Sequence, residues 1–149
     1  MTSARDDLVE LSRYAWQRLW DRMAGLTDDE YTWTPGVTTL AWRLDHIVGF
    51  LSEDRNGPWL GQPARVLNRS GAPGNAAEAL ATLEAAHDTW RTVLEGTTDE
   101  SLAEPMGGVA GPYGSSTRRS FVLHVLDELI HHGAEVALLR DLYRAKLDG

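Results

Sequence analysis

The chain of 149 residues contains no cysteine, so it can form neither disulfide bonds nor thiolate–metal bonds. Any metal ion must therefore be held by histidine and carboxylate side chains. The sequence also lacks an apolar run of membrane-spanning length and an N-terminal signal core, so we expect no membrane association and a cytoplasmic location. Basic residues are few: 14 lysines and arginines against 22 aspartates and glutamates give a formal charge of -8, which argues against nucleic-acid binding.

Helical periodicity is what the sequence does contain. Apolar residues recur at helical spacing in four long segments, at about 3–24, 39–54, 75–96 and 116–147. Loops rich in glycine and proline lie at 56–74 and 105–116, and short turns are expected at 27–30 and 97–100. Length and pattern predict a single all-α domain, residues 1–149, that folds as an up-down four-helix bundle with long inter-helix loops and room for a crossover.

The last helical segment carries ionisable residues where a bundle helix should present its core. At about 100° per residue, one face of this segment begins and ends with apolar side chains. Its middle holds His124, Glu128, His131, His132 and Glu135. Buried ionisable groups are costly unless they are paired or bound to a metal. A metal site inside the bundle is therefore the leading interpretation, and a buried polar network without metal is the alternative.

The spacing on this helix allows more than one pair of ligands. Residues four apart lie one turn apart on the same face, so both can point at a single ion. Glu128 has this relation to His132 and also to His124, and a three-residue spacing relates it to His131. From the spacing alone, these alternatives stay open.

A third ligand must come from another helix, because one helix cannot surround an ion. His46 is the natural candidate, since it lies between Trp42 and Phe50 on the second helix, where a solvated histidine is not expected. Two neutral imidazoles and one carboxylate leave positions open on a divalent ion, whereas closed structural sites use four ligands. Three ligands therefore favour a catalytic site, in which the ion lowers the pKa of bound water or activates a thiol, over a structural one.

Several of these residues also fit simpler roles. His124 and His87 are typical of satisfied histidines in or beside a core, and Glu135 can pair with an arginine. His131 can hardly share the role of His132 fully, so one of the two is expected to make outer contacts.

A di-iron carboxylate site is the competing metal hypothesis. Glu84 with His87 and Glu128 with His131 form two Glu-x-x-His motifs, the pair that such sites require. The site also needs an inward glutamate from each of the other two helices. Glu10 projects away from the apolar stripe of the first helix, so the di-iron hypothesis is the weaker one.

Four segments resemble the DinB-like metal-binding bundles, a superfamily that includes thiol-dependent S-transferases. Leu26-Thr-Asp-Asp-Glu30, Trp33-Thr-Pro35 and Leu40-Ala-Trp-Arg-Leu-Asp-His46-Ile resemble the family's entry into its second helix. The run from 124 to 140, with Glu128 and His132 four residues apart, resembles its last helix. Together these segments extend the resemblance over nearly the whole chain.

The resemblance implies His46, Glu128 and His132 as the metal ligands and leaves His131 outside. Many members of the family carry histidine where Glu128 stands. The branch that resembles the metal-binding domain of mycothiol-dependent maleylpyruvate isomerase has glutamate there, as this chain does. Because the chain stops after the bundle, isomerase activity itself is not expected.

The function implied by the resemblance is thiol transfer. It implies a divalent metal, with zinc as first choice and nickel or iron as alternatives, that binds a low-molecular-weight thiol co-substrate and presents it to an electrophile. We therefore expect a cytoplasmic, metal-dependent thiol S-transferase that forms a homodimer through apolar helix surface. The alternatives are a metal-assisted hydrolase with Glu135 or His131 as the base, and a non-catalytic metal-binding, stress-associated protein. No catalytic residue beyond the ligands is identified.

Overall fold

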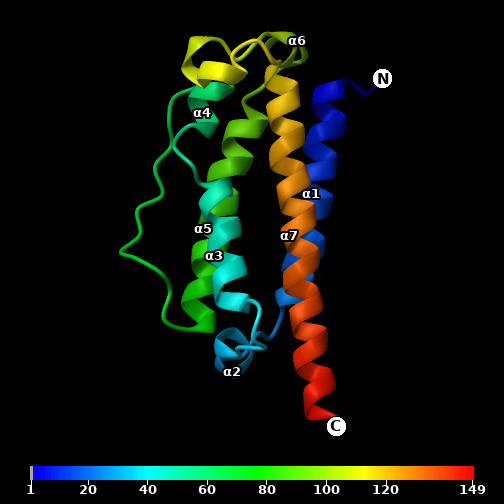
Figure 1. The fold of residues 1–149 in the computed structure, drawn as a ribbon. Helices are drawn as coiled ribbons and strands as arrows, with labels where there is room; N and C mark the ends of the chain where they lie inside the picture. The colour runs from blue at the N-terminus through cyan, green and yellow to red at the C-terminus, as the bar shows by residue number, and fades with distance from the viewer. Residues whose placement is uncertain (1) are drawn as a thin grey trace.

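The computed structural model describes residues 2–149, which contain helices and no strand (Figure 1). The elements are α1 (Ala4–Met23), α2 (Asp28–Thr32), α3 (Leu40–Leu51), α4 (Asn56–Trp59), α5 (Ala76–Glu95), α6 (Asp99–Ala103), the 3₁₀ turn η1 (Gly108–Tyr113) and α7 (Arg118–Leu147). The predicted all-α class is confirmed, and α1, α3, α5 and α7 are its four long helices. None of the helices in this range has the length and apolar composition needed to span a membrane.

The four long helices pack around one apolar core with a crossover between two of them. α3 contacts α5 and α7, while α1 contacts α7 and α5. In Figure 1, α1 and α7 run from top to bottom, and α3 and α5 run from bottom to top. The loop at 61–75 therefore returns along the length of the bundle, so α3 and α5 are parallel. The crossover for which the long loop leaves room lies here. It interrupts the alternating up-down order predicted from the sequence and makes α3 and α7 an antiparallel pair.

The spacing of Thr27 and Glu30 predicts a capping box, and Asn75, with Glu78 three residues on, is a typical N-cap; the structure confirms both helix starts. The Thr27 Oγ1 accepts from the backbone N–H of Glu30 at 3.2 Å and opens α2. Similarly, Asn75 Oδ1 accepts from the backbone N–H of Glu78 at 2.9 Å and opens α5, which ends at Gly96. Each cap satisfies a backbone donor that has no partner inside the helix.

The second long helix ends earlier than predicted, and the loop after it begins with the short helix α4. Asn56, which is buried, donates from Nδ2 to the carbonyl oxygens of Phe50 and Leu51 at 2.9 and 3.3 Å. These bonds satisfy carbonyls at the C-terminus of α3 and let the chain turn away. A Cβ on Gly57 would collide with the backbone carbonyl oxygen of Pro63, so glycine is required in this turn.

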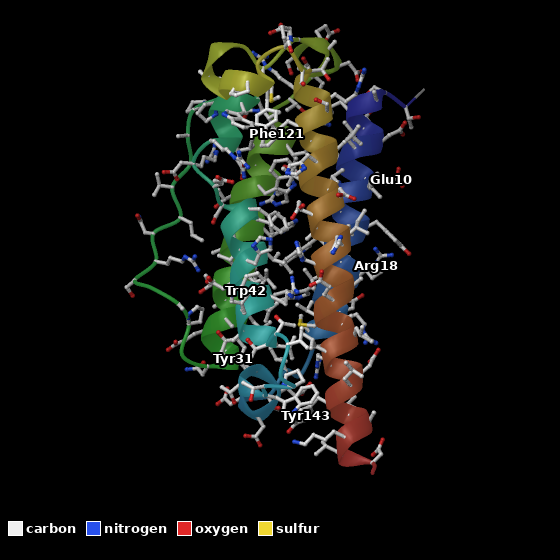
Figure 2. The ribbon with its side chains drawn as sticks, viewed as in Figure 1. Glu10, Arg18, Tyr31, Trp42, Phe121 and Tyr143 are labelled. Carbon is white, nitrogen blue, oxygen red and sulfur yellow. The ribbon has the colours of Figure 1, made fainter. Side chains whose placement is uncertain are left out.

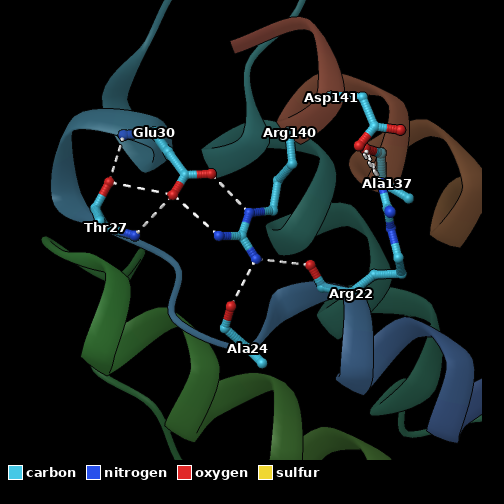
Figure 3. Close-up of polar contacts among 7 residues, drawn as sticks. All are labelled: Arg22, Ala24, Thr27, Glu30, Ala137, Arg140 and Asp141. Atoms are coloured by element: carbon cyan, nitrogen blue, oxygen red, sulfur yellow. Dashed lines mark hydrogen bonds and ion pairs between the residues drawn. The ribbon is translucent and has the colours of Figure 1, made fainter. Parts of the chain in front are cut away.

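A buried ion pair closes the lower end of the bundle (Figure 3). Arg140 donates from Nε and Nη2 to the two carboxylate oxygens of Glu30 at 2.6 and 3.0 Å. Its Nη1 donates to the carbonyl oxygens of Arg22 and Ala24 at 2.7 and 2.8 Å. Burial raises the pKa of Glu30, but Arg140 and the hydrogen bonds from Thr27 outweigh burial and hold this pKa below its ordinary value. One arginine thus ties the end of α1 and the helix α2 to α7.

His87 is a core residue, which confirms the simpler of its two roles. Its ring stacks on Trp16, with centroids 3.9 Å apart and an angle of 3° between the planes. Burial lowers the pKa of His87 to about 4; Asp88 raises it slightly and Arg91 adds to the lowering. The ring is therefore neutral in the folded protein at neutral pH.

We expect the free energy of unfolding to fall as the pH is lowered from about 6.5 to about 4. In this window the unfolded chain binds a proton at His87 that the folded protein excludes, so acid favours unfolding. The expected loss is about 2 kcal/mol, less than the full pKa difference would give, because solvent screens part of the effect. Urea denaturation at a series of pH values, in the presence of a chelator, measures it. A His87→Phe variant should lose this part of the pH dependence, and an unchanged profile would contradict the assignment.

Candidate metal centre

Three ligand-type side chains from α3 and α7 meet at the interface of this antiparallel pair. His46 Nε2 lies 3.1 Å from His132 Nε2, which in turn lies 3.1 Å from Glu128 Oε2. The remaining side of the triangle, from His46 Nε2 to Glu128 Oε2, is 3.7 Å. Two residues labelled in Figure 2 help to locate the helices: Trp42 lies on α3, four residues before His46, and Phe121 lies near the start of α7, seven residues before Glu128. The structure thus brings together the three residues that the resemblance implies.

The ring of His46 is held by its neighbours on the same helix. Trp42, one turn before it, stacks on the ring with centroids 5.4 Å apart and planes 9° apart. Phe50, one turn after it, meets the ring edge-on at 5.8 Å and also lies 6.3 Å from the ring of His132. The aromatic stripe that marked His46 in the sequence therefore orients its ring.

The triangle has the size that a divalent ion needs. A circle through the two nitrogens and the oxygen has a radius of about 1.9 Å, close to the 2.0–2.2 Å bonds that zinc forms with histidine and carboxylate. Histidine and carboxylate are also donor types that zinc, nickel and iron accept. The residues present therefore fit a single ion.

The cluster lies at the edge of the core and is not enclosed by it. The side chains of His46, Glu128 and His132 are 40%, 30% and 12% exposed. The expectation that this stripe faces the core is confirmed for apolar members such as Phe121 and Val125, which are buried. It is wrong for the middle of the stripe, where Glu128 and His131 are 30% and 64% exposed. Solvent, and hence a small molecule, can reach the triangle.

Glu135 lies behind His132, on the side of the ring away from the triangle. Its Oε1 is 3.2 Å from His132 Nδ1 and 2.8 Å from His131 Nε2. Its Oε2 is 2.7 Å from Arg43 Nε, so the predicted pairing of Glu135 with an arginine is present. A carboxylate at the second nitrogen of a ligating histidine fixes the orientation and tautomer of the ring.

The Glu135→Gln variant should bind zinc about 10- to 100-fold more weakly than the wild type, because the outer carboxylate lies at His132 Nδ1 and favours the ring orientation and tautomer that leave Nε2 for the ion. Competition with a chromophoric zinc chelator measures the affinity. Asp127→Asn removes the same charge from an exposed position of α7 and serves as the matched control. Equal losses in the two variants would indicate a general effect of charge and would contradict the role assigned to Glu135.

The other sequence candidates lie elsewhere. Within residues 2–149, two groups of three side chains are close enough to hold an ion: the triangle, and His131 with His132 and Glu135. His124 belongs to neither group and is exposed. Glu84 is exposed and His87 is stacked in the core, so the two Glu-x-x-His motifs of the di-iron hypothesis do not converge.

Two functional features were missed in the sequence. Arg43 precedes His46 by three residues and therefore shares its side of α3, which is the signal that could have identified it as the partner of Glu135. Arg140 lies in an apolar stripe of α7, and a buried cation needs a buried acidic partner, which is the signal that could have identified the pair. From the sequence, Glu30 fits a capping box, and its second role as the partner of Arg140 was missed.

Two comparisons with known proteins relate this chain to others. The family model described as the DinB superfamily matches residues 12–136. Among solved structures, the chain is similar to a conserved protein from Enterococcus faecalis, with a TM-score of 0.67 and 15% sequence identity, over 95% of this chain and 98% of that one. At this identity the likeness supports the fold alone. A search of curated proteins finds no match.

Proposed function

The chain belongs to the DinB superfamily, and from this premise we propose that it is a metal-dependent enzyme that transfers a low-molecular-weight thiol to an electrophile. The observation that carries the proposal is the convergence of His46, Glu128 and His132 on one solvent-accessible point. Three ligands leave positions for a small molecule, whereas structural sites normally use four.

The side chains divide into those that would hold the metal and those that hold the ligands in place. His46, Glu128 and His132 would bind the divalent ion, with zinc as first choice and nickel or iron as alternatives. A divalent ion bound there supplies Lewis acidity, which favours the thiolate form of a thiol at neutral pH. Glu135, close to His132 Nδ1, would orient that ring, and the ion pair with Arg43 would hold Glu135 in place. Because the chain has no cysteine, no thiolate of its own competes with the co-substrate.

The proposed reaction is a substitution by sulfur. The thiol sulfur forms a bond to the electrophilic carbon, and the bond from that carbon to its leaving group breaks. The leaving group departs with the bonding electron pair, and the thiol proton passes to solvent. The thiolate is the reactive form, so the rate is expected to depend on the fraction of thiol that is ionised.

Metal-assisted hydrolysis is the second hypothesis, and the contacts of its proposed bases weaken it. Glu135 is held as the counter-ion of Arg43 and also contacts His131. Its oxygen faces Nδ1 of His132, whereas the triangle is built on Nε2 of that ring. A carboxylate in this position supports a ligand more readily than it activates water.

Thiol dependence is the deciding measurement. Zinc-loaded protein is assayed with 1-chloro-2,4-dinitrobenzene and a panel of thiols that includes cysteine, glutathione and mercaptoethanol. We expect thiol-dependent release of chloride that falls to the uncatalysed rate in the His132→Ala variant. Chloride release without thiol would favour the hydrolase. Normal zinc binding with no turnover of any thiol would favour a non-catalytic metal-binding protein.

A further inference from the structure

A second feature of α7 lies one helical turn from the triangle. A pocket of about 360 Å³ is formed where α4 and η1 cover the start of α7. One of its lining residues is His124, four residues before Glu128 and therefore its neighbour along the helix face. A larger hollow of about 560 Å³ lies between α1 and α7. None of the three triangle residues lines either hollow, but only the smaller one includes a side chain one turn from Glu128 on the same helix face, that of His124.

The walls of this pocket are aromatic. Trp59 lies 4.9 Å from the ring of Phe121 and 6.2 Å from the ring of Tyr113, measured between centroids. Phe121 is buried, so it forms a fixed floor, whereas Tyr113 is 61% exposed and lies at the rim. A pocket with such walls favours a flat apolar group.

One cation stands among these rings. The guanidinium carbon of Arg55 lies 4.4 Å from the Trp59 ring centroid and 5.8 Å from that of Phe121. Its Nε is 3.0 Å from Glu53 Oε2, and the side chain remains 39% exposed. The N–H groups of a guanidinium lie in its own plane. When its face lies on an aromatic ring, two of these N–H groups can still donate hydrogen bonds sideways to one carboxylate.

We propose that this pocket binds the electrophilic substrate, and that the substrate carries a carboxylate on a flat apolar body: Arg55 pairs with the carboxylate, and Trp59 and Phe121 stack on the body. The distance suits such a molecule, since Phe121 and Glu128 are seven residues apart, or about 10 Å along the helix axis. That span fits an aryl carboxylate together with the sulfur that attacks its far end. That the bound molecule is an electrophile rests on the proposed thiol transfer. That the pocket binds an aryl carboxylate is independent of the proposed thiol transfer.

Direct binding tests the pocket without metal or turnover. Metal-free protein is titrated calorimetrically with 3,5-dinitrobenzoate, which has no leaving group, and with neutral 1,3-dinitrobenzene. Arg55→Gln should weaken the binding of the benzoate by about 10-fold and leave the neutral probe unchanged, because only the former has a charge to pair. Trp59→Leu should weaken the binding of both probes. Circular dichroism and thermal melts establish that each variant is folded.

Arg119→Gln is the matched control, because Arg119 is an exposed cation of α7 near the pocket in sequence but is not part of its lining. Equal effects of the two arginine substitutions, or none from Arg55→Gln, would overturn the proposal.

Measurements of turnover show whether the electrophile or the thiol occupies this pocket. For zinc-loaded protein, Arg55→Gln should raise KM for 4-chloro-3,5-dinitrobenzoate about 10-fold and leave KM for 1-chloro-2,4-dinitrobenzene unchanged. A rise in KM that instead followed the charge of the thiol, with mercaptopropionate compared against mercaptoethanol, would overturn the assignment to the electrophile. Absence of turnover with both electrophiles, beside normal benzoate binding, would count against the proposed function alone.

Discussion

The His132→Ala variant is expected to bind zinc at least about 100-fold more weakly than the wild type. His132 is the one side chain that lies 3.1 Å from both other members of the triangle. Its removal leaves His46 Nε2 and Glu128 Oε2 as the two remaining donors, 3.7 Å apart. Substituting an outer partner of a metal site already costs about 10- to 100-fold in affinity, and loss of a ligand should exceed that. Isothermal titration of metal-free protein with zinc measures the change.

His124→Ala is the matched control for this experiment. His124 is on the same helix, is exposed, and belongs to neither group of close metal-type side chains. Its loss should leave the zinc affinity within about twofold of the wild-type value. Equal zinc binding by His132→Ala and the wild type would contradict the ligand assignment, whereas loss in His124→Ala would favour the alternative pairing of Glu128 with His124.

The Arg140→Leu variant is expected to lower the free energy of unfolding by about 3–5 kcal/mol. The substitution leaves the Glu30 carboxylate buried without its counter-ion and removes the donor to the carbonyl oxygens of Arg22 and Ala24. Burial of an unpaired charge and of unsatisfied carbonyls accounts for the size of the effect. Urea denaturation monitored by circular dichroism measures it.

Arg22→Leu is a matched substitution at the surface. Arg22 pairs with Asp141, and the two side chains are 39% and 55% exposed, so this contact should be worth only about 0–1 kcal/mol. Glu30→Gln, which keeps hydrogen-bonding groups but removes the buried charge, should fall between the two. If Arg140→Leu cost no more than Arg22→Leu, the pair would not have the anchoring role described here.

Local chemistry explains why much of the fold and the candidate site could be predicted from the sequence. Helical period alone places His132 one turn from Glu128, because the geometry of a helix is the same in every protein. Capping is local as well, so Thr27 and Asn75 could be identified from the few residues that follow them. His46 was identified as unusual because of its aromatic neighbours along α3, which are also local.

Contacts between distant segments could not be predicted in this way. The buried carboxylate of Glu30 and its partner Arg140 are 110 positions apart, and no local pattern relates them. Asn56 ends α3 through hydrogen bonds to the preceding turn, which depend on the path that the chain takes afterwards. The solvent exposure of the triangle depends on how α7 is rotated against α3. The choice of metal and thiol, the homodimer and the cytoplasmic location stay predictions.

The crossover between α3 and α5 has a consequence for the order of folding. It lies between His46 and His132, which are 86 positions apart, so the triangle closes a long loop of chain. Closing a loop of this length lowers the conformational entropy of the chain, and the contacts formed within a single helix do not offset that cost. Before the bundle forms, an ion can be bound by Glu128 and His132, which are neighbours along α7. The third donor, His46, comes into range only when α3 packs on α7. The complete triangle therefore forms together with the packing of α3 on α7 and not before it.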